Sequence, residues 1–143
     1  MSKICIAVDV MGGDFGPETT VPASCRFAAD HPEIEIALYG DEAVIKKYVF
    51  SEIENIKIFH CERNIKMHDG LLSALKRYHL SSIGRAIQSL QARKSQAVIS
   101  AANTGVLMAI SRKILRTLNG IHRPAIISSF PTKKRRDTWI VDL

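Results

Sequence analysis

The chain has 143 residues, the length of one ordinary domain, and its 46% hydrophobic and 24% charged residues lie close to globular averages. This composition excludes a disordered chain, and no apolar run approaches the roughly 20 residues that a membrane-spanning helix needs. The formal net charge of +6 favours anionic partners, without selecting among nucleic acid, acidic protein, phosphorylated ligand and lipid headgroup.

The first half of the chain predicts an alternation of strands and helices. Pro17 stands where a helix begins, and the helix ends where Asp30 precedes His31-Pro32. Asp41 is placed to cap a second helix that runs to about Val49. Short apolar runs bounded by turn residues predict buried strands at residues 4–8, 34–39 and 56–59.

The second half continues the alternation after an irregular stretch, residues 61–72. A helix is predicted over 82–94, and a tight link, residues 101–105, leads into another helix. That helix is expected to end near Asn119-Gly120, because both residue types tolerate positive φ. Strands are predicted at residues 97–100, 125–129 and 138–143, the last two joined by a polar hairpin loop at 131–137.

Strands that alternate with helices indicate right-handed βαβ units and a mainly parallel sheet. The predicted fold is therefore of the α/β class with a mainly parallel sheet, in a single domain, residues 1–143. The last strand reaches the final residue without the helix that the pattern predicts. We therefore expect the chain to stop before this fold is complete, with strand edges left unpaired.

In open α/β sheets, ligands bind beyond the carboxyl ends of the strands, and two segments there carry polar residues. The first begins at Asp9. Its Gly12 and Gly13 let backbone N–H groups approach a ligand, and the next helix offers a positive dipole end. Asp9 and Asp14 are better suited to orient loops or accept a hydrogen bond. The alternative is that the glycines only form a tight turn.

The second segment runs from Ser100 to Gly105, at the start of a helix. N–H donors, a Thr hydroxyl and an Asn amide converge there where the helix dipole is positive, which predicts a phosphate-type anion site. The alternative is that Asn103 or Thr104 merely caps the helix.

No metal site, disulfide or covalent nucleophile is predicted. Cys5, Cys25 and Cys61 lack C-x-x-C spacing, and the first two suit small core positions. His60 and His68 are interpreted as loop histidines. No nucleophile elbow or phosphate-binding P-loop motif is present, and a serine at 81 or 82 is interpreted as a helix cap.

Three segments resemble the PlsX-type phosphate acyltransferases, in the same order along the chain. Residues 8–17 (Val-Asp-Val-Met-Gly-Gly-Asp-Phe-Gly-Pro) resemble the opening signature of that family. Residues 100–107 resemble its Ser-Ala-Gly-Asn-Thr-Gly-Ala-Leu segment, and residues 120–125 resemble its Gly-Ile-x-Arg-Pro-Ala segment.

The resemblance implies transfer of a fatty acyl group from acyl carrier protein to inorganic phosphate, giving an acyl phosphate for phospholipid synthesis. It also implies a three-layer α/β/α fold similar to phosphotransacetylase, a homodimer, a cytoplasmic location with peripheral association at the inner membrane face, and no metal or redox cofactor. The residues it implicates are Asn103 and Asp9 as catalytic groups, and Gly12, Gly13, Asp14, Ser100, Thr104 and Gly105 as substrate-binding groups.

The sequence departs from the family pattern at two points. Ala102 replaces a glycine, which would crowd a backbone that must approach the ligand. Gly70-Leu71 stands where relatives carry a Lys-Pro or Arg-Pro pair, which removes a cation. Two other functions remain open: an inactive fragment that binds phosphate or a carrier partner, and a nucleic-acid-binding domain suggested by the basic run 133–136. No recognition helix, zinc pattern or RNA-binding signature supports the second, so no nucleic-acid partner is expected.

Overall fold

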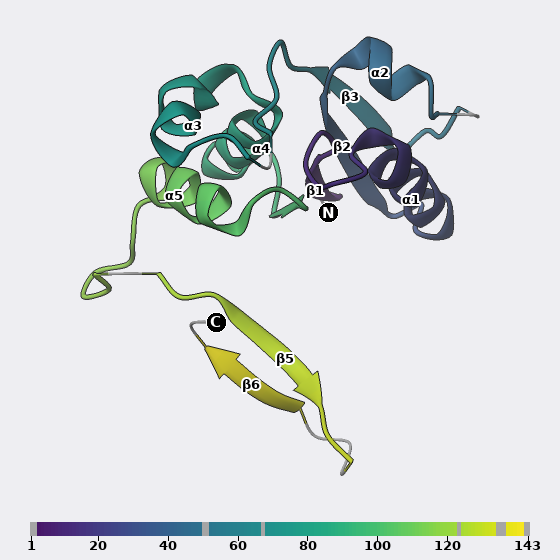
Figure 1. Cartoon of the computed structure of the whole chain (residues 1–143). Helices are drawn as coiled ribbons and strands as arrows, with labels where there is room; N and C mark the ends of the chain where they lie inside the picture. The colour runs from purple at the N-terminus through teal and green to yellow at the C-terminus, as the bar shows by residue number, and fades with distance from the viewer. Residues whose placement is uncertain (1–2, 50–51, 67, 123, 134–136, 142–143) are drawn as a thin grey trace.

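The computed structural model describes residues 3–49, 52–66, 68–122, 124–133 and 137–141. Its main body is an α/β unit around a four-stranded sheet with strand order β3-β2-β1-β4, in which every pairing is parallel (Figure 1). This confirms the predicted α/β class and the parallel sheet. The strands are β1 (Ile4–Asp9), β2 (Ile34–Gly40), β3 (Ile56–His60) and β4 (Ala97–Ser100).

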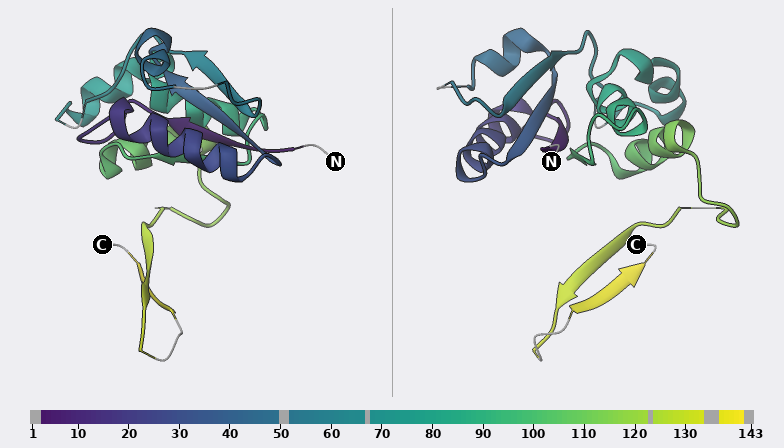
Figure 2. Two further views of the ribbon diagram at one scale, coloured as in Figure 1. Left: turned by 90° about the vertical axis from the view of Figure 1, so that its right-hand side faces the viewer. Right: turned by 180° about the vertical axis from the view of Figure 1, so that it is seen from behind.

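Helices cover both faces of the sheet and form the outer two layers (Figure 2). On one face lie α1 (Pro17–Asp30) and α2 (Glu42–Lys46), and on the other lie α3 (Leu71–Arg77), the 3₁₀ turn η1 (Tyr78–Leu80), α4 (Ser82–Gln91) and α5 (Thr104–Leu115). Because side chains alternate along a strand, β1 supplies both cores. Val8 packs in the core with Val21 of α1, whereas Ala7 packs with Ala86 of α4.

The face of the sheet under α4 is built from small side chains, which let the helix approach the strands closely. Cys5, Ala7 and Ala37 are buried there together with Ala86. Gly84, at the start of α4, packs against the preceding turn η1, because a Cβ at that position would collide with the backbone carbonyl of Tyr78. The packing of α4 therefore depends on the absence of a side chain at residue 84.

Several predicted element boundaries were wrong. The helix predicted over 82–94 ends at Gln91, and the strand predicted at 125–129 lies at 127–131. Residues 71–80 form α3 and η1, which the prediction left within or next to an irregular stretch. The helix capped by Asp41 is only five residues long and ends at Lys46. Helix α5 ends at Leu115, because Arg116 takes a left-handed conformation with φ 65°, a full turn before the predicted stop at Asn119-Gly120.

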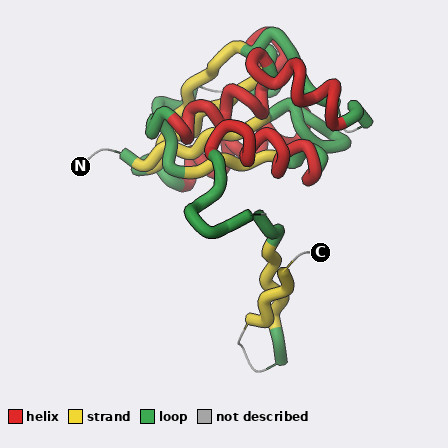
Figure 3. Tube along the Cα trace, turned by 90° about the vertical axis from the view of Figure 1, so that its left-hand side faces the viewer, coloured by secondary structure: helices red, strands yellow, loops and turns green. Residues whose placement is uncertain are grey.

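The carboxyl-terminal strands form a separate hairpin that stands apart from the main body (Figure 3). β5 (Ile127–Pro131) and β6 (Asp137–Val141) pair antiparallel, which confirms the predicted hairpin. Lys134, Arg135 and Arg136 of the basic run, and the end of the last predicted strand at residues 142–143, lie outside the described residues. The hairpin leaves Trp139 61% exposed, and at the edge of the sheet Ile99 of β4 is 55% exposed.

We expect Gly84→Ala to destabilise the fold by about 1–3 kcal/mol, although alanine is the better helix former, because the new methyl group would push α4 away from the Tyr78 carbonyl. The matched control is Gly70→Ala, where no atom lies within 4 Å of the added Cβ, and its effect should stay within about 0.5 kcal/mol. Urea unfolding of both variants measures the difference. Equal effects would contradict the packing described for α4.

Candidate functional site

The two loops singled out in the sequence meet at the carboxyl ends of β1 and β4. These strands are neighbours in the sheet, and Asp9 is directly opposite Ser100 in the register. The chain leaves β1 for α1 on one face and leaves β4 for α5 on the other. Two neighbouring strands whose loops leave for opposite faces form the switch point at which open α/β sheets bind their ligands.

The buried carboxylate of Asp9 joins the two loops. Its Oδ2 accepts a hydrogen bond from the Ser100 hydroxyl at 2.7 Å, and its Oδ1 accepts one from the Met11 backbone N–H at 3.3 Å. The Gly12 N–H and the Ser82 hydroxyl lie close enough to favour its charged form. The Asp9 side chain is thus bonded to its own loop and to the loop after β4, with the start of α4 beside it.

Burial raises the pKa of Asp9, because desolvation of the carboxylate outweighs the opposing effect of its hydrogen bonds from Ser82, Ser100 and the loop backbone. Asp9 is only 2% exposed. This geometry suits a group that fixes the positions of both loops, as the sequence suggested for the aspartates. Its role as a catalytic group remains a prediction.

The two glycines of the first loop allow the second loop to pack directly against it. A Cβ at Gly12 would lie 2.8 Å from the backbone nitrogen of Ala102, and one at Gly13 would lie 3.0 Å from the Ala101 Cβ. Gly13 also has a positive φ of 91°, which disfavours any other residue. Within the structure these glycines serve loop-to-loop contact, and Asp14 lies exposed on the same loop.

The second loop ends in a capped helix. The Asn103 side-chain oxygen accepts a hydrogen bond from the Val106 N–H at 3.2 Å, and its carbonyl accepts one from Leu107 at 2.9 Å. Capping by Asn103 is therefore real. Thr104 and Gly105 lie in the exposed first turn of α5. The N–H groups of a first helical turn have no acceptor within the helix, and the helix dipole there favours an anion.

Both departures from the family pattern have a local explanation. Among the described non-glycine residues, Arg93 and Arg116 have a positive φ, and Ala102 does not. The backbone at residue 102 therefore tolerates a methyl group. Gly70 precedes α3 in an extended conformation, and Leu71 is the first residue of that helix. The Ala102 methyl therefore takes part in loop packing without straining the backbone.

The sequence analysis missed Ser82 as a member of the site. Ser81 is the cap of α4, since its hydroxyl accepts a hydrogen bond from the Gly84 N–H at 3.2 Å. Ser82, 1% exposed, is oriented instead toward Asp9. The adjacent serine pair before an apolar helix was the available signal, because only one of the two can serve as the cap.

The cysteine and histidine near the site show no catalytic features. Burial raises the pKa of Cys61 to about 11, so its thiol stays protonated near neutral pH and is a poor nucleophile. His60 is exposed and its Nδ1 accepts a hydrogen bond from the Glu42 N–H at 3.2 Å. Within the described ranges, no three His, Cys, Asp or Glu side chains gather as metal ligands would. No described helix combines the length and the apolar character needed to cross a bilayer.

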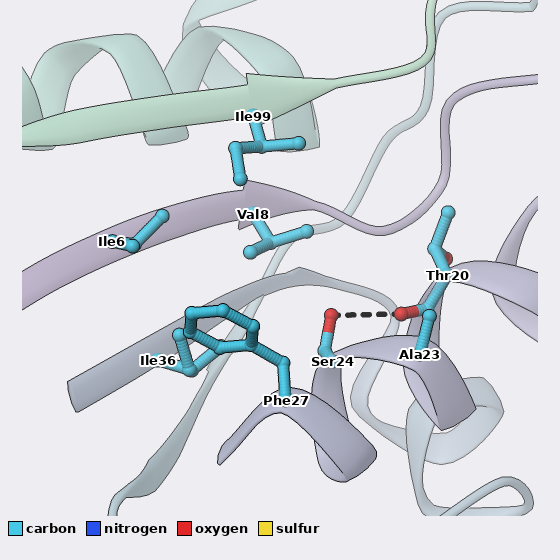
Figure 4. Close-up of a pocket in the computed structure, with 8 residues that line it drawn as sticks. All are labelled: Ile6, Val8, Thr20, Ala23, Ser24, Phe27, Ile36 and Ile99. Atoms are coloured by element: carbon cyan, nitrogen blue, oxygen red, sulfur yellow. Dashed lines mark hydrogen bonds between the residues drawn. The ribbon is translucent and has the colours of Figure 1, made fainter. Parts of the chain in front are cut away.

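The main body has two apolar hollows. One, of about 260 Å³, lies between α1 and the face of β1, β2 and β4 that the helix covers (Figure 4). Phe27 reaches across it toward the strands, and Ser24 is tied to Thr20 by a hydrogen bond to the Thr20 carbonyl. The other, of about 560 Å³, lies between α3 and α5 and includes Gly105 of the candidate site.

The fold defines an α/β protein whose two candidate loops lie side by side at the point where the strand order reverses. The chain matches the family described as "Fatty acid synthesis protein" over residues 4–143, and it belongs to that family. This confirms the resemblance stated from the motifs.

Individual relatives carry the name phosphate acyltransferase. The chain is 39% identical over 147 aligned residues to the phosphate acyltransferase of Vibrio parahaemolyticus and 40% identical over 147 to that of Shewanella pealeana. It is 41% identical over 145 residues to that of Polynucleobacter necessarius. The alignments cover 99–100% of this chain but 43% of each relative, so the chain spans less than half of their length.

The raised pKa of Asp9 predicts a specific pH dependence of stability. A raised native pKa contributes stability that is complete below the unfolded value, near 3.9, and is lost as the pH rises through the native value. The free energy of unfolding of the native sequence, measured relative to Asp9→Asn, should therefore increase as the pH is lowered from 7 to 4.

Urea unfolding of both proteins across this pH range measures that difference. Ser100→Ala is the informative companion, because loss of a donor to the carboxylate should raise the pKa of Asp9 further and extend the pH dependence to higher pH. A difference that stays constant or shrinks on acidification would show that Asp9 is not desolvated as described.

Proposed function

We propose that the site formed by the loops after β1 and β4 and by the first turn of α5 binds inorganic phosphate and catalyses its acylation by a carrier-bound fatty acyl thioester. The observation that carries the proposal is the direct packing of two family motifs on each other, joined by the 2.7 Å hydrogen bond between Ser100 and Asp9. The names of the relatives and of the family support the acyl and phosphate specificity.

Phosphate is assigned to the exposed first turn of α5. The N–H groups of Thr104 and Gly105 and the positive end of the 12-residue helix stabilise its charge, and the Thr104 hydroxyl and Asn103 lie at the same corner. Asp9 is a positioning residue here, since it holds the loop after β4 against the loop after β1. Orientation and charge stabilisation are the main sources of catalysis in such a site.

The proposed reaction is a direct displacement. An oxygen of hydrogen phosphate attacks the thioester carbonyl, a C–O bond forms, the C–S bond breaks, and the phosphate proton passes to the departing thiolate. The products are the acyl phosphate dianion and the free carrier thiol, so charge and atoms balance.

An acidic carrier protein is the proposed acyl donor. The last turns of α3 and α5 carry exposed basic residues, and the two helices pack side by side in Figure 1. Opposite charges favour association with an anionic partner. The basic residues are Lys76, Arg77, Arg112 and Lys113. The homodimer and the peripheral membrane association are further proposals that follow from the resemblance.

We expect purified chain to release free thiol from acyl–acyl carrier protein only when phosphate is present. Asn103→Asp keeps the side-chain oxygen that caps α5 but adds a negative charge at the proposed phosphate corner. The phosphate concentration that gives half-maximal thiol release should therefore rise by at least about tenfold. Thiol release, followed with a chromogenic thiol reagent across a phosphate titration, measures the effect.

The control is Ile45→Val, a buried change in α2 on the opposite face of the sheet, which costs about 0.5–1.5 kcal/mol of stability without altering the site. It should leave the phosphate titration unchanged. Phosphate binding without thiol release from the folded chain would favour the second candidate function, a binding fragment, which the 43% coverage of the relatives supports. Absence of phosphate binding would overturn the proposal.

A further inference from the structure

The groove between α3 and α5 is the larger of the two apolar hollows described above, at about 560 Å³, a volume typical of small-molecule sites. Its walls come from Leu71 and Leu75 of α3 and from Met108 and Ala109 of α5. Nothing in the family match assigns an occupant to it. Its apolar lining indicates a hydrocarbon ligand.

The groove is continuous with the proposed phosphate corner. Gly105, which follows Thr104 in the first turn of α5, lines one end of it, and Arg112 lines the other. Residues 105, 108, 109 and 112 share one face of the helix, since they are spaced by three, four and seven residues. This face of α5 is the floor of the groove, and at a rise of 1.5 Å per residue it is about 10 Å long from residue 105 to residue 112.

The cationic end of the groove does not interrupt its apolar floor. Arg112 and Lys113 are exposed, and the Lys113 ammonium lies 5.2 Å from the centre of the Tyr78 ring. Long basic side chains of this kind cover apolar surface with their methylene stems while their charges stay in water. An elongated apolar ligand can therefore run the length of α5 beneath them.

We propose that this groove holds the hydrocarbon chain of the acyl thioester, with the reacting carbonyl at the Gly105 end and the chain extending toward Arg112. This inference rests on the proposed function, because it names the binding surface for the acyl part of that substrate. It explains why apolar side chains of α3 stay exposed beside the site: Leu71 is 46% exposed and lines the groove.

The groove predicts a dependence of affinity on chain length. Each methylene buried against the floor should tighten binding by about fourfold until the groove is full. The probes are S-butyryl, S-octanoyl and S-dodecanoyl pantetheine, and their binding to the full chain is measured by calorimetry, which requires no turnover. Octanoyl pantetheine should bind at least tenfold more tightly than the butyryl compound.

Two variants locate the binding surface. Met108→Trp fills the groove and should abolish the gain from octanoyl over butyryl pantetheine. Leu71→Gln should reduce octanoyl affinity several-fold. Leu80→Gln is the matched control, because Leu80 is 45% exposed and does not line the groove. Circular dichroism confirms folding, and Ala109→Leu provides a smaller obstruction if Met108→Trp does not fold.

A phosphate titration of the same proteins separates this inference from the proposed function. If native chain binds phosphate and Met108→Trp keeps the chain-length gain, the acyl chain lies elsewhere and only the groove assignment is overturned. If native chain binds phosphate but shows no gain with chain length, the groove assignment is again overturned. If it binds neither phosphate nor any acyl probe, both proposals are wrong.

Discussion

The arrangement of the site depends on one buried carboxylate. Asp9 ends β1, one of the two inner strands of the sheet, and its two oxygens accept hydrogen bonds from Ser100 and Met11, with Gly12 and Ser82 close beside them. Burying a charged group is costly unless it is well hydrogen-bonded, and these donors offset part of the cost of desolvation. Because these groups belong to three different segments, satisfying this carboxylate fixes the relative positions of β1, β4 and α4.

The elements that were predictable from sequence are those specified by local signals. An apolar run and Pro17 were enough to predict β1 and α1, whose bounds the structure places at Ile4–Asp9 and Pro17–Asp30. The segment of α3 gave a weaker signal, because it has no side-chain cap and follows the turn-forming pair Asp69-Gly70. The end of α5 was not predictable either, because Arg116 adopts a positive φ that its residue type does not suggest.

Some residues of the candidate site were likewise predictable from the sequence, and others were not. Asp9, Ser100 and Asn103 could be named from the sequence because they follow predicted strands or begin a predicted helix, and strand order then brings the first two together. Ser82 could not, since its contact with Asp9 depends on how closely α4 packs on the small residues of the sheet. The same holds for the groove beside Gly105, which requires the unpredicted helix α3 as its second wall.

The pairing of β1 with β4 also has a consequence for the order in which the molecule is built. Asp9 and Ser100 are 91 residues apart, and contacts of such long sequence separation form slowly because a large loop must close first. The pairs β1–β2 and β2–β3 join strands that are consecutive along the chain, so they can form earlier. The junction of the loops after β1 and β4 is consequently among the last features of the sheet to form. An anion bound at this junction would stabilise only the chain in which β1 and β4 have paired.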